Sequence, residues 1–266
     1  MDQSQIISLA AGVLPESDGI VVAQAAADAG YRHFGVTVDE AWSAATTAAV
    51  RRLQREHGLA VLDVEVVWLA TGARITDLHR KIIDVGAALG ADNVLIVSAE
   101  PDEALVADAL HGLCELAAPA GMRVALEFLR ITAITRPSQA LRIARAAAHP
   151  AAAVLVDTLH LSRSGESADI LQGAAALLPY LQLCDGPLAF DDSDQGLLTD
   201  ALDRRSAAGE GELPLADALA LNPGAPLSLE VRSQHYRERY PDPAARADAI
   251  LQQTRRYLNA AHTEGV

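Results

Sequence analysis

Four short apolar runs in the second half of the chain carry a polar residue close to their C-terminal ends. The runs are "RVALEF", "AVLVD", "YLQLCD" and "PLSLEV". In each run the apolar residues expected to face outward share one parity, and the polar residue has the other. Successive side chains of a strand point to opposite faces, so these polar residues face one common axis if the runs are neighbouring strands of a barrel. They are Glu127, Asp157, Gln182 and Glu230.

This set predicts a metal site. Three carboxylates in one buried pocket repel each other and lose hydration unless a cation compensates them. The predicted ligands of one divalent ion are Glu127, Asp157, Gln182 and Glu230. All four donors are oxygens, so Mn or Mg is expected, and Co or Zn can substitute. The metal would act as a Lewis acid and stabilise an enediolate while a carboxylate removes the proton next to a carbonyl. His160, three residues after Asp157, is expected to face the compound that the metal binds.

The elements that position these residues alternate between strand and helix. The candidate strands are "QIISLA", "HFGVTV", "LDVEVVWL", "NVLIVS", "RVALEF", "AVLVD", "YLQLCD" and "PLSLEV". Helical stretches such as "DEAWSAATTAAVRRLQREHG" lie between them, and several end on glycine. No G-x-G-x-x-G follows the first strand, which argues against a dinucleotide fold. Eight such units predict a single (β/α)8 TIM barrel over residues 1–266, of the α/β class.

The motifs resemble the sugar phosphate isomerase/epimerase superfamily, the xylose isomerase-like TIM barrels. The resemblance covers essentially the whole chain and is carried by "ALEF", "VDTLH", "LQLCD", "GEGELPL" and "SLEV". It implies that Glu127, Asp157, Gln182 and Glu230 bind one divalent metal. It also implies that Glu127 and Glu230 move protons and that His160 contacts substrate oxygens.

The first functional prediction is a metal-dependent isomerase or epimerase of a polyhydroxylated keto compound, a sugar or a sugar-like molecule. The alternative is a dehydratase of 3-dehydroshikimate or inosose type, because Gln182 stands where many epimerases have histidine. In that case a β-hydroxyl would leave with His160 as the acid, and the product would be an enone. A non-catalytic barrel without metal is disfavoured by the intact carboxylate set.

A more distant alternative is an endonuclease IV-like phosphodiesterase. Those enzymes use three zinc ions held largely by histidines, and the early-strand ends "VTVDE" and "VVWLATG" offer no histidine.

Three further residues are predicted to bind substrate. Arg205 matches an arginine that relatives place near the glycine motif, and an arginine can grip an anion through two hydrogen bonds. Arg232 shares the inward parity of Glu230, and Trp68 lies near the end of its strand, where it could form a pocket wall. Asp185 has the opposite parity and is expected to hold the loop that begins "DGP".

Composition limits the partners. The formal net charge of −14 argues against binding a nucleic-acid backbone. No run reaches about 18 apolar residues and the N-terminus has no signal-peptide pattern, so neither a membrane span nor secretion is expected. With only two cysteines, Cys114 and Cys184, a cytoplasmic protein acting on a small molecule is predicted. The resemblance implies a homodimer or homotetramer.

Overall fold

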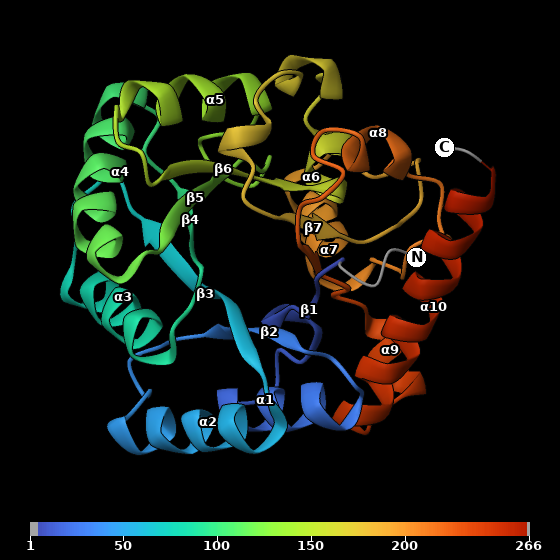
Figure 1. Cartoon of the computed structure of the whole chain (residues 1–266). Helices are drawn as coiled ribbons and strands as arrows, with labels where there is room; N and C mark the ends of the chain where they lie inside the picture. The colour runs from blue at the N-terminus through green and yellow to red at the C-terminus, as the bar shows by residue number, and fades with distance from the viewer. Residues whose placement is uncertain (1–4, 265–266) are drawn as a thin grey trace.

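The computed structural model describes residues 5–264, and its eight parallel strands close into one barrel. The strands are β1 (Ile7–Leu9), β2 (His33–Thr37), β3 (Ala60–Leu69), β4 (Asn93–Ser98), β5 (Arg123–Glu127), β6 (Ala152–Asp157), β7 (Leu181–Leu183) and β8 (Leu227–Leu229). Each strand pairs with the next, and β8 pairs with β1. Figure 1 shows the strands β1 to β7 inside the ring of helices. The prediction of a (β/α)8 barrel is therefore confirmed.

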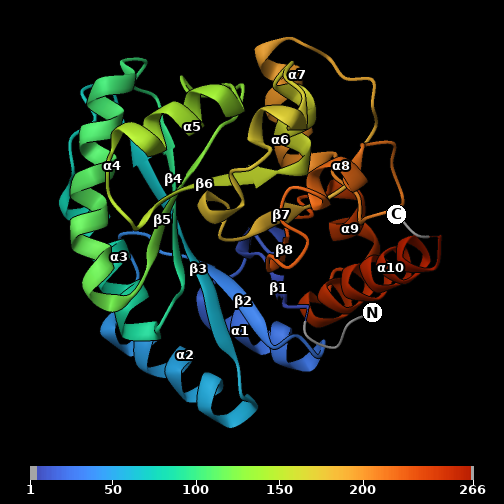
Figure 2. The same ribbon diagram turned by 45° about the horizontal axis from the view of Figure 1, so that its top comes forward.

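Helices surround the strands (Figure 2). The α-helices are α1 (Gly19–Asp28), α2 (Ala44–His57), α3 (Asp77–Leu89), α4 (Glu103–Ala117), α5 (Pro137–Ala146), α6 (Thr158–Arg163), α7 (Asp194–Asp203), α8 (Leu215–Leu219), α9 (Gln234–Arg239) and α10 (Pro243–Glu264). The last helix, α10, packs against α1 and so closes the outer ring. Within residues 5–264, none of the helices has the length and apolar character that crossing a membrane requires.

Two apolar clusters follow from the alternation of side chains along the strands. Outward-facing residues such as Val124 and Leu126 pack against the helices in a large core. A smaller cluster fills part of the barrel interior and consists of Leu62, Leu95, Val97, Ala125, Leu129, Ala153, Leu155 and Tyr180. It lines β3 to β6, whereas the interior positions of β1, β7 and β8 carry the buried Ser8, Gln182 and Ser228. Apolar side chains therefore predominate in the interior along β3 to β6, and polar side chains along β1, β7 and β8.

The helix expected from Asp39 onward begins later than the sequence pattern predicted. Ser43 Oγ accepts a hydrogen bond from Thr46 N at 3.1 Å, and the two residues form a capping box that starts α2 at Ala44. Asp39 Oδ1 accepts from Trp42 N at 2.9 Å, which keeps the preceding residues in a loop. Trp42 thus belongs to the loop at the C-terminal end of β2 and not to a helix.

Asp185 organises the segment that follows β7. Its Oδ1 accepts hydrogen bonds from Gly186 N at 2.8 Å and Leu213 N at 3.0 Å, and its Oδ2 accepts from Gly209 N at 3.0 Å. These bonds tie the glycine motif to the end of the strand, so the prediction of a structural role for Asp185 is confirmed. The segment 186–212, which follows β7, includes the helix α7.

Candidate active site

The four predicted metal ligands lie at the C-terminal end of neighbouring strands. Glu127 is the last residue of β5, Asp157 the last of β6, Gln182 the centre of β7, and Glu230 follows β8 directly. Asp157 pairs in register with Gln182, and Gln182 with Ser228, two residues before Glu230. All four are buried, with at most 6% of any of them exposed. The catalytic end of a (β/α)8 barrel is the one where these residues meet.

Glu127, Asp157 and His160 come closest together. One ligand atom from each lies within 4.8 Å of the other two, which makes them the group that could hold a metal ion among the residues described. Asp157 caps α6, because its Oδ1 accepts from His160 N at 3.0 Å. The cap brings the imidazole back over the barrel, where His160 Nε2 lies 3.9 Å from Glu127 Oε1.

Arg205 lies inside this group. Its Nη1 forms an ion pair with Asp157 Oδ2 at 2.5 Å and also donates to the backbone oxygen of Glu230 at 3.2 Å. Its Nη2 lies 3.2 Å from His160 Nε2. Arginine has donors and no acceptor, so His160 Nε2 accepts this bond and carries no proton. Arg205 was predicted to grip substrate, but the structure places it against the predicted ligands.

The ionisation of these groups follows from burial and charge. Burial lowers the pKa of His160 to about 4, although Asp157 opposes the shift. Burial alone would raise the pKa of Asp157, but Arg205 and His160 outweigh it and hold that pKa below its usual value. Burial, followed by the charge of Asp157, raises the pKa of Glu127 well above its usual range. The imidazole is therefore neutral and Asp157 is ionised, whereas Glu127 holds a proton unless a cation compensates it.

Glu230 points away from this group toward β1. A Cβ atom at Gly12 would clash with Glu230 Oε1, so the two residues are in close contact. Glu230 Oε2 is buried and has no hydrogen-bond partner among the described residues. Burial, and then the charge of Glu65, raise the pKa of Glu230 to about 7.

Two carboxyl groups that the sequence reasoning missed, Asp63 and Glu65, enter the barrel interior from β3. Tyr180 Oη donates to Asp63 Oδ2 at 3.2 Å, and Thr37 Oγ1 donates to Glu65 Oε1 at 3.0 Å. Burial raises the pKa of each to about 7, helped by Glu230 for Asp63 and by Asp63 for Glu65. The signal that could have revealed them is the alternation in "LDVEV", which repeats that of the later strands.

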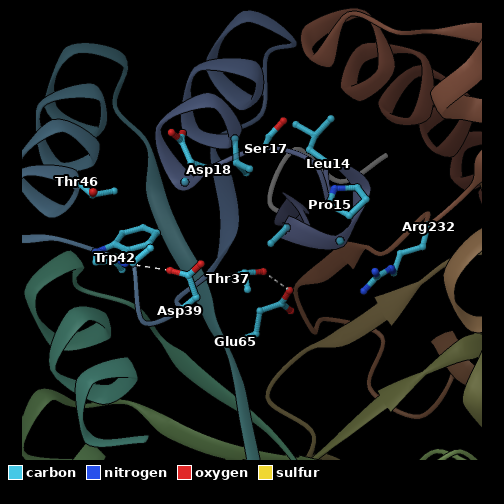
Figure 3. Close-up of a pocket in the computed structure, with 15 residues that line it drawn as sticks. Leu14, Pro15, Ser17, Asp18, Thr37, Asp39, Trp42, Thr46, Glu65 and Arg232 are labelled. Carbon is cyan, nitrogen blue, oxygen red and sulfur yellow. Dashed lines mark hydrogen bonds between the residues drawn. The ribbon is translucent and has the colours of Figure 1, made fainter. Parts of the chain in front are cut away.

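A cavity of about 440 Å³ opens beside Glu230, over the ends of β1, β2 and β3. Its wall includes Trp42, Thr37, Glu65 and Arg232 (Figure 3). Trp68 does not line this cavity. It lies near the end of β3 with 47% of its surface exposed. Of the predicted substrate contacts, the structure thus places Arg232 in the cavity wall, Arg205 against Asp157 and His160, and Trp68 outside the cavity.

The donor set fits a divalent cation. The interior holds the carboxyl groups of Asp63, Glu65, Glu127, Asp157 and Glu230, against the guanidinium groups of Arg205 and Arg232. Glu230 Oε2 is buried without a partner among the described residues, and burial, with the charges of neighbouring carboxylates, raises the pKa of Glu127 and Glu230. A cation would stabilise the ionised form of both groups. The residues that would hold the ion are Glu127 and Asp157, through their carboxylate oxygens. Gln182 and Glu230 were predicted to complete the oxygen set, but Glu230 points toward Gly12. The Nε2 lone pair of His160 is used by Arg205.

Comparison with known proteins gives two curated relatives. A 3-dehydroshikimate dehydratase of Pseudomonas putida KT2440 is 29% identical over 246 residues, covering 85% of this chain and 37% of that protein. A 3-dehydroshikimate dehydratase of Pseudomonas aeruginosa is 30% identical over 205 residues, covering 71% of this chain and 32% of that protein. This chain therefore spans about a third of the length of these relatives.

Solved structures share the fold. A xylose isomerase-like TIM barrel/4-hydroxyphenylpyruvate dioxygenase fusion protein superposes with a TM-score of 0.80 at 23% identity, over 98% of this chain and 44% of that one. The IolI protein with a bound zinc atom superposes with a TM-score of 0.77 at 16% identity, over 95% of this chain and 99% of that one. The family model for the xylose isomerase-like TIM barrel matches residues 23–260. The chain belongs to the xylose isomerase-like TIM barrel family.

Proposed function

We propose that this protein is a metal-dependent dehydratase that removes water from a hydroxylated cyclic ketone of the 3-dehydroshikimate kind. The observation that carries the proposal is the buried group of Glu127, Asp157 and His160 at the catalytic end of the barrel. A base beside a neutral imidazole and an arginine suits removal of a proton next to a carbonyl. The names of the two curated relatives support elimination as the outcome.

Each residue has a role in this reaction. A bound divalent cation would supply positive charge for the carbonyl oxygen on which negative charge develops. Glu127 takes the proton from carbon and then, in its protonated form, gives that proton to the departing β-hydroxyl, so that one water is lost. His160 Nε2 has no proton, because it accepts from Arg205. The proton of the neutral imidazole therefore lies on Nδ1, and this N–H is the group that His160 offers to a substrate oxygen. This differs from the sequence-based prediction, in which His160 was the acid.

The second candidate is the isomerase or epimerase that the sequence put first. The observation in its favour is Glu230, a second buried carboxyl group with a pKa near 7 that lies apart from Glu127. If Glu230 returned the proton from the other face, the product would be an epimer instead of an enone.

The test is turnover of 3-dehydroshikimate, an inosose and a keto sugar in heavy water, with and without Mn. We expect Mn-dependent loss of water from 3-dehydroshikimate, seen as the absorbance of the conjugated product, and loss of that activity in Glu127→Gln. Deuterium entering carbon of the keto sugar without elimination would favour the second candidate. No reaction and no exchange with any of the three compounds would contradict both.

A further inference from the structure

Arg232 is the cation of the site that makes no direct polar contact through its side chain, although its charge lowers the pKa of Glu65 and of Glu230. Arg205 is fully engaged, since its guanidinium contacts Asp157, His160 and the backbone oxygens of Ala201 and Glu230. The side chain of Arg232, in contrast, forms no ion pair and no hydrogen bond with any residue from 5 to 264, and its Nε is buried without a partner. Only its backbone oxygen is used, by Arg205 N at 3.1 Å.

The cavity beside Glu230 surrounds this free guanidinium. Arg232 is the one cationic side chain among the residues that line the cavity. The three acidic lining residues already have local partners: Asp18 accepts from Ile20 N and Val21 N, Asp39 from Trp42 N, and Glu65 from Thr37 Oγ1. Glu65 and Arg232 reach toward the same space in Figure 3, yet they do not come within ion-pair distance. An anion from outside the protein would supply the missing partner.

The cavity also adjoins Glu230, one of the four predicted metal ligands. Gly12 is the residue between them, because a Cβ there would clash with Glu230 Oε1 and would lie 3.1 Å from Arg232 Cδ. A ligand whose anionic end binds Arg232 can therefore place its other end next to Glu230.

We propose that this cavity is a carboxylate-binding subsite in which Arg232 receives the acidic group of a small hydroxylated substrate. A guanidinium binds a carboxylate through two parallel hydrogen bonds. The neighbouring carboxylates of Asp18, Asp39 and Glu65 favour a singly charged group over a doubly charged phosphate. The inference rests on the proposed function for the identity of the reacting end, and it assigns to Arg232 the anion recognition that the sequence divided between Arg205 and Arg232.

The experiment is calorimetric binding at pH 8 with and without Mn. The probes are shikimate, a hydroxylated carboxylate without the reactive ketone, its uncharged methyl ester, and inorganic phosphate. We expect shikimate to bind at least tenfold more tightly than the ester and than phosphate. Arg232→Gln should weaken the binding of shikimate by about tenfold or more, since one charged hydrogen-bonded pair is worth roughly that factor. The affinity for the ester should not change. Arg232→Lys should recover part of the loss.

Two further variants serve as a control and as a second test. Arg51→Gln removes an exposed arginine of α2 and should leave binding unchanged. Glu65→Gln removes a negative charge beside the subsite and should increase the affinity for shikimate severalfold. Equal shikimate binding by wild type and a folded Arg232→Gln, or tighter binding of phosphate than of shikimate, would overturn the proposal. The probe does not react, so failure of this inference and failure of the dehydratase proposal are separate results.

Discussion

At the scale of single residues, Arg205 decides the charge balance of the site. It is buried and pairs with Asp157. Because it donates to His160 Nε2, it also determines which imidazole nitrogen carries the proton. A pair of this kind is costly to break from one side, because the remaining charge stays buried. Arg205 therefore holds Asp157 ionised, and burial together with Arg205 keeps His160 neutral before any substrate arrives.

Arg205→Gln should lower the free energy of unfolding of the metal-free protein by about 3 kcal/mol, since an unpaired buried carboxylate is left behind. Urea denaturation measures the change, and Mn should restore part of the loss by supplying positive charge. Arg51→Gln is the matched control, because that side chain is exposed on α2. Equal stability of the Arg205 variant and wild type would contradict the assigned role.

Asp63 should make the free energy of unfolding depend on pH. Burial raises its pKa to about 7 in the folded protein from 3.8, so the folded chain keeps a proton that the unfolded chain releases. This carboxyl group therefore costs stability as the pH rises from about 4 to 7, by up to about 1.4 kcal/mol per pH unit. Asp63→Asn removes that cost, and the amide can still accept from Tyr180.

Denaturation of Asp63→Asn and wild type at pH 5 and at pH 8 tests the point. The variant should gain stability over wild type by about 1–3 kcal/mol between the two pH values. A difference that is the same at both would show that Asp63 titrates normally in the fold.

The site could be predicted only where strand parity was regular. Glu127, Asp157 and Glu230 stand out because their apolar neighbours alternate cleanly. Asp63 and Glu65 lie on β3, whose pairing with β2 shifts register between Phe34 and Gly35. The alternation in "LDVEV" puts both residues on one face of the strand. Such a bulge changes which face is inward, and it cannot be seen in one strand alone. The pairing of Arg205 with Asp157 joins residues 48 apart in sequence, and no local pattern encodes it.

At the scale of elements, short turns at the C-terminal ends of the strands set the positions of catalytic groups. Gly12 lies in the 3-10 turn Ala11–Val13 after β1, directly against Glu230. Helix N-caps also set the positions of side chains. Ser43 starts α2 late enough to leave Trp42 in the cavity wall. Asp157 starts α6 so that His160 faces Glu127. A helix period read from sequence gives the helix but not the residue at which a cap starts it.

Gly12→Ala should reduce turnover by about tenfold to a hundredfold while the protein still folds, because the added methyl group displaces Glu230 and shifts of about 1 Å are costly at a reacting centre. Steady-state kinetics with Mn and the substrate found in the turnover experiment would measure it. Gly224→Ala is the control, since a Cβ there meets nothing within 4 Å. Equal activity of both variants would mean that Glu230 has no part in the reaction.

At the scale of the whole molecule, the barrel brings together residues from distant parts of the chain. The fold was predictable because eight strand–helix units alternate without interruption and each strand has a buried outer face. The cavity was not predictable, since loops after β1 and β2 form its wall and meet Arg232 from the far end of the sequence. The same closure places five carboxyl groups in one interior, which is the basis for expecting a cation there.

The most direct test of that expectation is anomalous diffraction from crystals of the protein grown with Mn. The account predicts one strong peak beside Glu127 and Asp157, within coordination distance of their oxygens, and its loss in Glu127→Gln crystals. A map without a peak, with Asp157 paired to Arg205 alone, would contradict the claim that this barrel acts through a bound metal.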